Sequence, residues 1–266
     1  MTLTRILPTV SSDESAPQLD YHDLVARGIH VPEFIEQGMQ GDFSFDLPGD
    51  ASFRSRVTPL SLSTAGKDVS LISGPPRHLR INSGALNGLP GPTVDGREMT
   101  YAGVFRYQVT PDNLRVLMGS ATGTGAGGGE FAYINSSGNI LLNVRGYANT
   151  VSLHYSALAG AGISQGDFIF VAVTSKLVSD TTTEHVIFIG SQNPISATGV
   201  GVKNISTMSK TIAVGNAYND FSAGYFASSV DVGRFLSGRG GRDVSELEAM
   251  YKRAKIVASR RGMIIH

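Results

Sequence analysis

The sequence predicts a mainly β protein, an antiparallel β-sandwich of the jelly-roll type with a short helical N-terminal arm and a C-terminal helix. Three observations predict this fold class. Short apolar stretches recur between turn residues, and no helices alternate with them. The chain of 266 residues holds 32 glycines, which suits a fold with many tight turns. Near the C-terminus a partly alternating stretch, residues 229–237, is broken by glycines and then followed by a helical pattern.

Residues 1–45 differ from the rest of the chain and are interpreted as an N-terminal anchoring arm. Two short helices are predicted at residues 19–28 and 32–38, where Pro32 suits a first helical position and Gly38 a stop. The few apolar side chains of this arm cannot form a core alone. It must therefore dock either on its own β domain or on another chain, and the sequence leaves both alternatives open.

Residues 46–242 carry the pattern of a jelly-roll β-sandwich. Many short strands with turn chemistry between them favour an antiparallel sandwich. The run Phe168–Val173 is continuously apolar, so we expect it in the middle of a sheet that is covered on both faces. The strand candidates are 69–73, 78–82, 100–109, 114–120, 130–135, 140–145, 150–155, 167–175, 185–189, 211–215, 224–227 and 229–237.

Residues 243–266 are predicted to form a helix and a tail that pack on the sandwich or on a partner. Asp243 occupies the N-cap position and Glu246 follows three residues later, which is the spacing of a capping box. An apolar stripe through residues 244–261 gives the helix one face to bury, and two heptads are too few for a coiled coil. Docking on the sandwich is therefore favoured. The apolar tail 263–265 suits pairing with a sheet edge, of this chain or of a neighbour.

The composition excludes several kinds of chemistry. Lys+Arg 22 balance Asp+Glu 22, so no global field indicates a nucleic-acid partner. The chain has no cysteine, which excludes disulfides, thiolate zinc sites and thiol nucleophiles. No apolar run approaches the ~20 residues of a membrane helix, and the N-terminus does not resemble a secretion signal. We therefore expect no membrane insertion and synthesis in the cytoplasm.

Motifs that would indicate an enzyme or a cofactor are weak. Gly123–Gly128 matches the dinucleotide fingerprint, but a strand pattern follows it where a helix is required, which favours a hairpin loop. The carboxylates Glu130, Asp167 and Glu184 are isolated at strand starts, without the facing partner that glycoside hydrolysis needs. The histidines show no metal-ligand spacing. We therefore expect no catalytic residues, no metal and no cofactor.

What remains is a set of tyrosines, amides and one strand histidine that lie in loops or alternate with core positions. A sheet face that carries such groups can stack on sugar rings and hydrogen-bond their hydroxyls, although a solvated sheet face also looks like this. The candidate glycan-binding residues are Tyr107, Tyr133, His154, Tyr218, Asn219 and Asp220.

Four segments resemble a known family: Gly166–Thr174, Glu184–Gly190, Ile212–Asn216 and Val230–Leu236. Their order is similar to the second half of a concanavalin A-like, or laminin-G-like, jelly roll of the lectin and glucanase type. Residues 243–251 are similar to the short helix that closes many bacterial and phage copies. The chain departs from that pattern in having no tryptophan, a longer final helix and no clear cluster of calcium ligands.

The arm, the single lectin-like domain and the missing catalytic pair together resemble bacteriophage tail fibres and other virion appendages. The resemblance implies a non-catalytic structural and adhesion protein of the virion. Its arm would join other virion proteins, its lectin-like domain would face host-surface glycan, and the chain would form a homo-oligomer, a trimer by analogy. The alternatives are a capsid or tail decoration protein that binds no glycan and an enzyme that degrades polysaccharide.

Overall fold

The computed structural model describes residues 36, 38–45, 49–84, 86–111, 113–121, 128–145, 151–155, 158–200, 210–218, 228–259 and 262–266. The chain divides into two compact units, residues 1–33 and residues 34–266, and every described residue belongs to the second unit. The arm helix predicted at residues 19–28 lies outside the described residues, as does most of the one predicted at 32–38.

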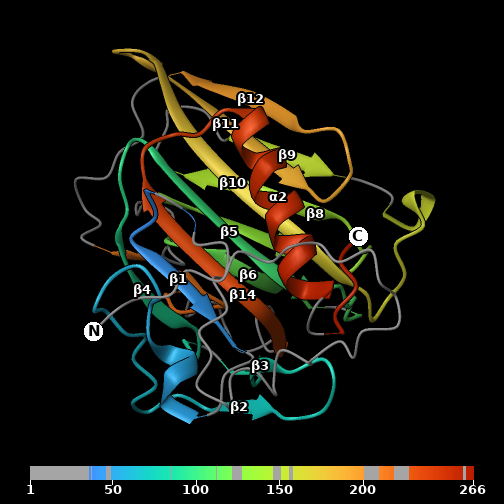
Figure 1. Ribbon diagram of the computed structural model, residues 1–266. Helices are drawn as coiled ribbons and strands as arrows, with labels where there is room; N and C mark the ends of the chain where they lie inside the picture. Colours follow the sequence, from blue (N-terminus) through green and yellow to red (C-terminus); the bar gives the residue numbers. More distant parts are fainter. Residues whose placement is uncertain are drawn as a thin grey trace, which may run out of the picture. The chain divides into compact units, whose positions relative to one another are not determined.

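Two antiparallel sheets make up the described part of the second unit (Figure 1). The eight-stranded sheet has the order β12-β11-β10-β5-β14-β3-β2, with β1 also pairing with β14, and the six-stranded sheet has the order β4-β13-β6-β7-β8-β9. The strands of the eight-stranded sheet are β1 Gly41–Ser44, β2 Val69–Ile72, β3 His78–Ile81, β5 Met99–Arg106, β10 Phe168–Ser179, β11 Thr182–Ile189, β12 Ile195–Val200 and β14 Val230–Arg239. Those of the six-stranded sheet are β4 Leu89–Val94, β6 Arg115–Gly119, β7 Gly129–Ile134, β8 Ile140–Arg145, β9 Val151–Tyr155 and β13 Thr211–Val214. The predicted antiparallel β-sandwich is confirmed.

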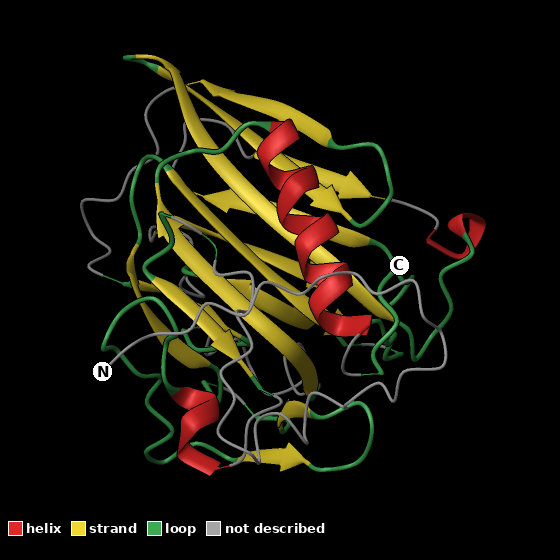
Figure 2. Ribbon diagram, in the orientation of Figure 1, coloured by secondary structure: helices red, strands yellow, loops and turns green. Residues whose placement is uncertain are grey.

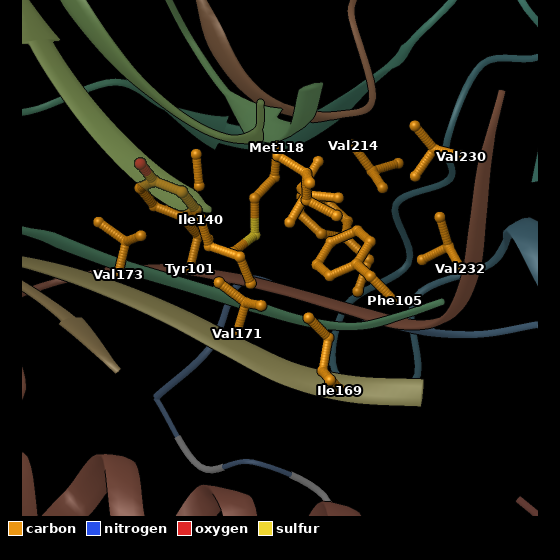
Figure 3. Packing of buried hydrophobic residues seen from close by; sticks show 14 of the residues in the cluster. Tyr101, Phe105, Met118, Ile140, Ile169, Val171, Val173, Val214, Val230 and Val232 are labelled. Atoms are coloured by element: carbon orange, nitrogen blue, oxygen red, sulfur yellow. The ribbon is translucent and has the colours of Figure 1, made fainter. Parts of the chain in front are cut away.

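The main core lies between the two sheets, because alternate residues of each strand point to opposite faces. On β10, Ile169, Val171 and Val173 enter this core, whereas Phe168 and Phe170 pack on the other face. The run Phe168–Val173 is therefore buried on both sides, as its continuous apolar pattern predicts. Figure 3 shows side chains from both sheets meeting in the core, among them Tyr101, Phe105, Met118, Ile140, Val171 and Val214.

Helix α2, Val244–Ser259, covers the outer face of the eight-stranded sheet (Figure 2). Its buried side, which includes Leu247 and Tyr251, packs on residues of β10 and β11 in a second hydrophobic cluster. Glu246 Oε2 accepts a hydrogen bond of 2.8 Å from the backbone N–H of Asp243, as the capping box predicts. Asp243 Oδ1, however, accepts from Lys176 Nζ, so the Asp243 side chain ties the helix start to β10.

The C-terminal tail docks on its own chain. Ile265 forms a parallel bridge with Phe168, and the N–H of His266 donates to the carbonyl of Phe168 at 3.0 Å. The side chains of Met263 and Ile265 are buried. The tail therefore bridges the start of β10, an interior strand, at Phe168, outside the stretch of β10 that pairs with β11; the predicted pairing with a sheet edge, of this chain or a neighbour, is not what the structure shows. It gives no support to an oligomer.

The predicted boundary between arm and sandwich, at residue 45, is too late. Residues 41–44 form β1, which pairs with β14 and is buried. Asp42 on β1 accepts hydrogen bonds from Arg56 and Arg234, which fixes the strand to the sheet. The short sequence Gly-Asp-Phe-Ser holds a single large apolar side chain, so it shows too little alternation to be recognised as a strand.

Two further strands were not predicted. Strand β4 contains Pro90 and Pro92, which argue against a strand because proline cannot donate to the ladder. It lies at the edge of the six-stranded sheet, where one side of the strand needs no donors. Strand β12 also lies at an edge and contains few large apolar residues. The strand predicted at 224–227 lies outside the described residues.

Candidate functional site

The outer face of the six-stranded sheet carries a group of aromatic and polar side chains. On β7, Ala132 and Ile134 enter the core, so Phe131 and Tyr133, which alternate with them, point outward. By the same alternation Leu141 and Asn143 point outward from β8, and Ser152 and His154 from β9. This face is the opposite side of the sandwich from the sheet that α2 covers (Figure 2).

Strand register arranges these side chains in two rows. In one row Tyr133 pairs with Leu141, which pairs with His154. In the next row Phe131 pairs with Asn143, which pairs with Ser152. Neighbouring strands lie about 4.8 Å apart, so Tyr133 and His154 are separated by roughly 10 Å. We call this surface the platform; its residues are Phe131, Tyr133, Leu141, Asn143, Ser152 and His154.

The platform is aromatic on one side and polar on the other. The rings of Phe131 and Tyr133 stack with centroids 5.0 Å apart and an interplanar angle of 28°. Phe131 is buried and Tyr133 half-buried, whereas Ser152 and His154 are exposed. Such a surface can hold the apolar side of a flat ligand against the ring of Tyr133 and exchange hydrogen bonds through hydroxyl, amide and imidazole groups.

Tyr218 lies beside another strand of the same sheet. Its hydroxyl is 2.8 Å from the hydroxyl of Thr211 on β13, and Lys210 Nζ lies 5.3 Å from its ring centroid. Thr211 points outward because the next residue, Ile212, is in the core. Burial raises the pKa of the Tyr218 hydroxyl above its ordinary value, although hydrogen bonding with Thr211 partly offsets this.

The structure therefore brings Tyr133 and His154 together in one row and places Tyr218 on the outward side of β13 in the same sheet. Tyr107 is elsewhere: it is buried in the core, and its hydroxyl donates to the carbonyl of Gly138 at 2.7 Å, with its pKa raised by burial. Asn219 and Asp220 lie outside the described residues. Sequence reasoning did not single out Phe131, Asn143 and Ser152; their signal was strand alternation, which becomes informative only once the register is known.

A buried polar cluster joins the two sheets, and no motif in the sequence indicates it. Ser175 Oγ lies 2.9 Å from Glu130 Oε2 and 2.9 Å from His185 Nδ1, and all three side chains are fully buried. A nucleophilic triad places the hydroxyl and the carboxylate on different imidazole nitrogens. Here Glu130 Oε2 approaches the same nitrogen, Nδ1, at 3.4 Å. The geometry fits a link between β7, β10 and β11 and not a nucleophilic triad.

Tyr101 and Asp95 belong to the same interior region. Burial raises the pKa of the Tyr101 hydroxyl well above its ordinary value, and the nearby carboxylates of Glu130 and Asp95 raise it further. Asp95 accepts a hydrogen bond of 2.8 Å from Ser120 Oγ. Both side chains are buried inside the sandwich.

The carboxylates considered as catalytic candidates point in different directions. Glu130 is inside the core, and Asp167 accepts from the backbone N–H of Ser164 at 2.7 Å. Glu184 lines a hollow of about 130 Å³ at the start of α2, together with charged residues of both signs such as Lys176. In the described part of the chain, no three His, Asp or Glu side chains gather as metal ligands would.

The glycine-rich segment matching the dinucleotide fingerprint connects β6 and β7, which pair antiparallel. Residues 122–127 lie outside the described residues, but the strand β7 that follows them occupies the place of the helix that would bind a pyrophosphate. None of the described helices is both long and apolar enough to cross a membrane.

Comparisons with known proteins show the fold. No protein-family model matches the chain, and no curated protein matches it by sequence. Among solved structures, the binding domain of Paraclostridial Mosquitocidal Protein 1 has a TM-score of 0.59 at 10% identity, covering 85% of this chain and 55% of that chain. The botulinum neurotoxin type G receptor-binding domain gives 0.57 at 11% identity, with 82% and 52% covered. The serotype D binding domain gives 0.51 at 10% identity, with 82% and 51% covered.

This chain thus spans about half the length of the structures it resembles. At such low identity the likeness shows the fold alone. The chain has a concanavalin A-like jelly-roll β-sandwich, similar in fold to part of these toxin binding domains. The sequence segments that resemble the concanavalin A-like family lie within Thr100–Tyr251.

Proposed function

We propose that the protein is a non-catalytic glycan-binding protein and that the platform holds the sugar. The observation that carries this proposal is the single row formed by Tyr133 and His154, two residues that the sequence indicates as ligand-binding, on one outward sheet face. The toxin domains of similar fold are described as binding or receptor-binding domains. That description supports the same class of function for this chain.

The platform residues have distinct parts in the proposed recognition. The apolar side of a sugar ring packs on Tyr133, whose ring is held in place by its stack on Phe131. Because the ring is already fixed, little side-chain entropy is lost when the ligand binds. Ser152 and His154 on β9 are exposed and supply hydrogen-bonding groups across the row. The result is weak, geometry-dependent binding of the kind that several copies of the protein can strengthen.

The proposal of a non-catalytic role rests on where the described carboxylates of the six-stranded sheet point. Glycoside hydrolysis needs two carboxyl groups on either side of the scissile bond, about 5 to 10 Å apart. Among the described side chains that point outward from the six-stranded sheet, none is a carboxylate, and Glu130 of β7 points into the core. A sugar on the platform would meet no carboxylic acid from these residues.

We further propose, from the sequence resemblance, that the protein works in a bacteriophage virion. Residues 1–33 would join other virion proteins, and the sandwich would present the platform to host-surface glycan. A homo-oligomer, a trimer by analogy, would multiply weak binding sites. Light scattering of the purified protein tests this last part: a mass near the 28.1 kDa of one chain would refute it.

The experiment for the main proposal is a glycan array probed with the purified full chain, followed by titration of the best ligand. Tyr133→Ala and His154→Ala should each weaken binding about tenfold or more, which corresponds to about 1.4 kcal/mol. His266→Ala is the control, because the side chain of His266 is 40% exposed but lies near the start of β10. Tyr133→Phe keeps the ring and should bind nearly as wild type.

Two outcomes would contradict the proposal. If no glycan binds, a decoration protein without a sugar ligand becomes the better interpretation. If the protein shortens a polysaccharide and releases reducing ends, it is an enzyme. Thermal unfolding of each variant must match wild type, so that a lost signal reports the site and not a lost fold.

A further inference from the structure

We infer that the outer face of the eight-stranded sheet holds a binding site for a phosphate or sulfate group, formed by Arg80 and Arg106. The site belongs to the other sheet from the platform and does not depend on the proposed function. Three neighbouring strands build it, because β14 pairs with β5 on one side and with β3 on the other (Figure 1). The inference follows from an ion cluster in which two arginines share one carboxylate.

Strand alternation directs this cluster to the outer face. Arg80 on β3, Asp231 on β14 and Arg106 on β5 point outward, because each alternates with residues of the main core. These core residues are Leu79, Ile81, Phe105, Val230 and Val232. Asp231 pairs with Arg80 in the register of β14 and β3, and Arg106 reaches the same carboxylate from β5.

The two guanidinium groups share the carboxylate of Asp231. Arg80 Nε and Nη2 donate to Oδ1 and Oδ2 at 2.7 and 2.8 Å, and Arg106 Nη1 donates to Oδ2 at 3.1 Å. The imidazole of His78 approaches the same Oδ2 at 3.4 Å. Two positive charges therefore meet one negative charge, and an anion that comes close is attracted by the remainder.

Each arginine keeps donors that Asp231 does not use. A guanidinium has five N–H groups. Within the described hydrogen bonds, Arg80 donates through Nε and Nη2 and Arg106 through Nη1, which leaves Arg80 Nη1 and Arg106 Nη2 for a ligand. Their side chains are 37% and 24% exposed, so a ligand can reach them from solvent. Arg106 Nε is buried and finds no acceptor among the described residues, so the cluster holds more donors than the fold uses.

Both arginines are held in place before a ligand arrives. Arg80 is fixed by its two hydrogen bonds to Asp231, and the guanidinium carbon of Arg106 lies 5.0 Å from the ring centroid of the buried Phe168. Arg80 and Arg106 contact the same oxygen, Oδ2, so one anion can reach both. A tetrahedral oxyanion has an oxygen for each guanidinium, and little side-chain entropy is lost when it binds.

The test is a calorimetric titration of the full chain with inorganic phosphate, together with thermal unfolding in phosphate and in sodium chloride of equal ionic strength. We expect phosphate to bind and to raise the Tm above its value in chloride. Arg80→Gln and Arg106→Gln should each weaken phosphate binding about tenfold, because each removes charge-assisted hydrogen bonds. Arg239→Gln is the control, since Arg239 is exposed at the other end of β14 and should leave phosphate binding unchanged.

Two further variants keep the inference testable if Arg106→Gln does not fold. Arg80→Lys keeps the charge but loses the planar fork, and should bind phosphate more weakly than wild type. Asp231→Asn frees both guanidinium groups, so it should bind phosphate several-fold more tightly and regain part of its lost Tm in phosphate. A Tm that rises equally in chloride and phosphate, or a phosphate Kd that the Arg80 variants leave unchanged, would overturn the inference.

A second arm identifies the source of the anionic group. A phosphorylated oligosaccharide, a sulfated one and their neutral counterpart are titrated in the same way. Tighter binding of a charged oligosaccharide than of inorganic phosphate, lost in Arg80→Gln, supports a group carried on a glycan, and binding of inorganic phosphate alone supports a free anion. Tyr133→Ala should change neither result, so failure of this site and failure of the platform can be told apart.

Discussion

Glu36 and Arg253 form a two-pronged ion pair that fastens the segment before β1 to the middle of α2. Arg253 Nε lies 2.9 Å from Glu36 Oε1, and Arg253 Nη2 lies 2.7 Å from Oε2. Glu36 is 1% exposed. Asp42, also buried, binds Arg234 in the same region. Residues that the sequence assigned to a separable arm therefore supply counter-charges to the sandwich and its helix.

Because of this ion pair, two truncations of the N-terminus should differ in thermal stability. A chain lacking residues 1–33 should melt within a few degrees of the full chain, because it keeps Glu36, β1 and every other described element. A chain lacking residues 1–45 also loses β1 and the carboxylates of Glu36 and Asp42. Removing one partner of a buried ion pair costs about 3–5 kcal/mol, so this chain should unfold at much lower temperature or fail to fold. Equal melting of the two truncations, measured by circular dichroism, would refute the prediction.

Helix α2 should be an integral part of the fold. Leu247 is fully buried, so Leu247→Ala should lower the free energy of unfolding by about 2–5 kcal/mol through lost burial and a residual cavity. Ile256 on the same helix is 42% exposed, and Ile256→Ala should change stability by no more than about 0.5 kcal/mol. Urea denaturation of both variants measures the difference. Similar values for the two would show that the helix does not pack as described.

Asp231 should make the fold sensitive to acid. Desolvation alone would raise the pKa of this carboxyl, but hydrogen bonds and charges from Arg80 and His78 outweigh it and hold the pKa well below its ordinary value. A carboxyl with a lowered folded-state pKa stabilises the protein above its unfolded pKa, near 4, and this contribution is lost as the pH falls further. Asp231→Asn should therefore cost on the order of 2 kcal/mol at pH 7, because Arg80 is partly exposed.

The difference between wild type and Asp231→Asn should shrink when both are unfolded at about pH 3, since the wild-type carboxyl is then partly protonated in the unfolded chain. Glu248→Gln is a suitable control, because Glu248 is exposed on α2. A gap that stays as large at pH 3 as at pH 7 would be inconsistent with a lowered pKa.

Gly190 should tolerate no side chain while the tail is in place. Its φ of 51° lies in the left-handed region, and a Cβ there would come within 2.2 Å of the His266 carbonyl oxygen. Gly190→Ala should therefore cost more than the about 1–2 kcal/mol expected for the backbone alone. In a chain ending at Ile264 the clash is absent, so the same substitution should cost less. A double-mutant cycle by thermal unfolding measures this coupling, and simple additivity would refute it.

Much of the sandwich could be predicted because its central strands show their burial in local pattern. The run in β10 is apolar throughout, and β8 and β9 place large apolar residues at every second position. Edge strands are less visible, because they can do without donors on one side, as β4 does with Pro90 and Pro92. Strand β1 is held by ion pairs to residues far along the chain, such as Arg234, and local pattern contains no trace of those.

The candidate site could be predicted only in part for the same reason. A tyrosine in or next to a strand looks alike in sequence whether it points outward, as Tyr133 does, or into the core, as Tyr107 does just after β5. The difference depends on register, and one residue of shift exchanges the two faces. The cluster of Glu130, Ser175 and His185 joins strands from both sheets, so no spacing in the sequence could indicate it.

The platform is built from three consecutive strands, β7 to β9, whose inward residues belong to the core and whose outward residues do not. If the platform binds a ligand as proposed, the residues that contact the ligand and the residues that form the core alternate along the same three strands. Substitutions at outward positions such as Leu141, Asn143 and Ser152 would then alter the ligand while the core residues stay unchanged. A library that varies only these outward residues should therefore change binding specificity while the free energy of unfolding stays close to that of the wild type.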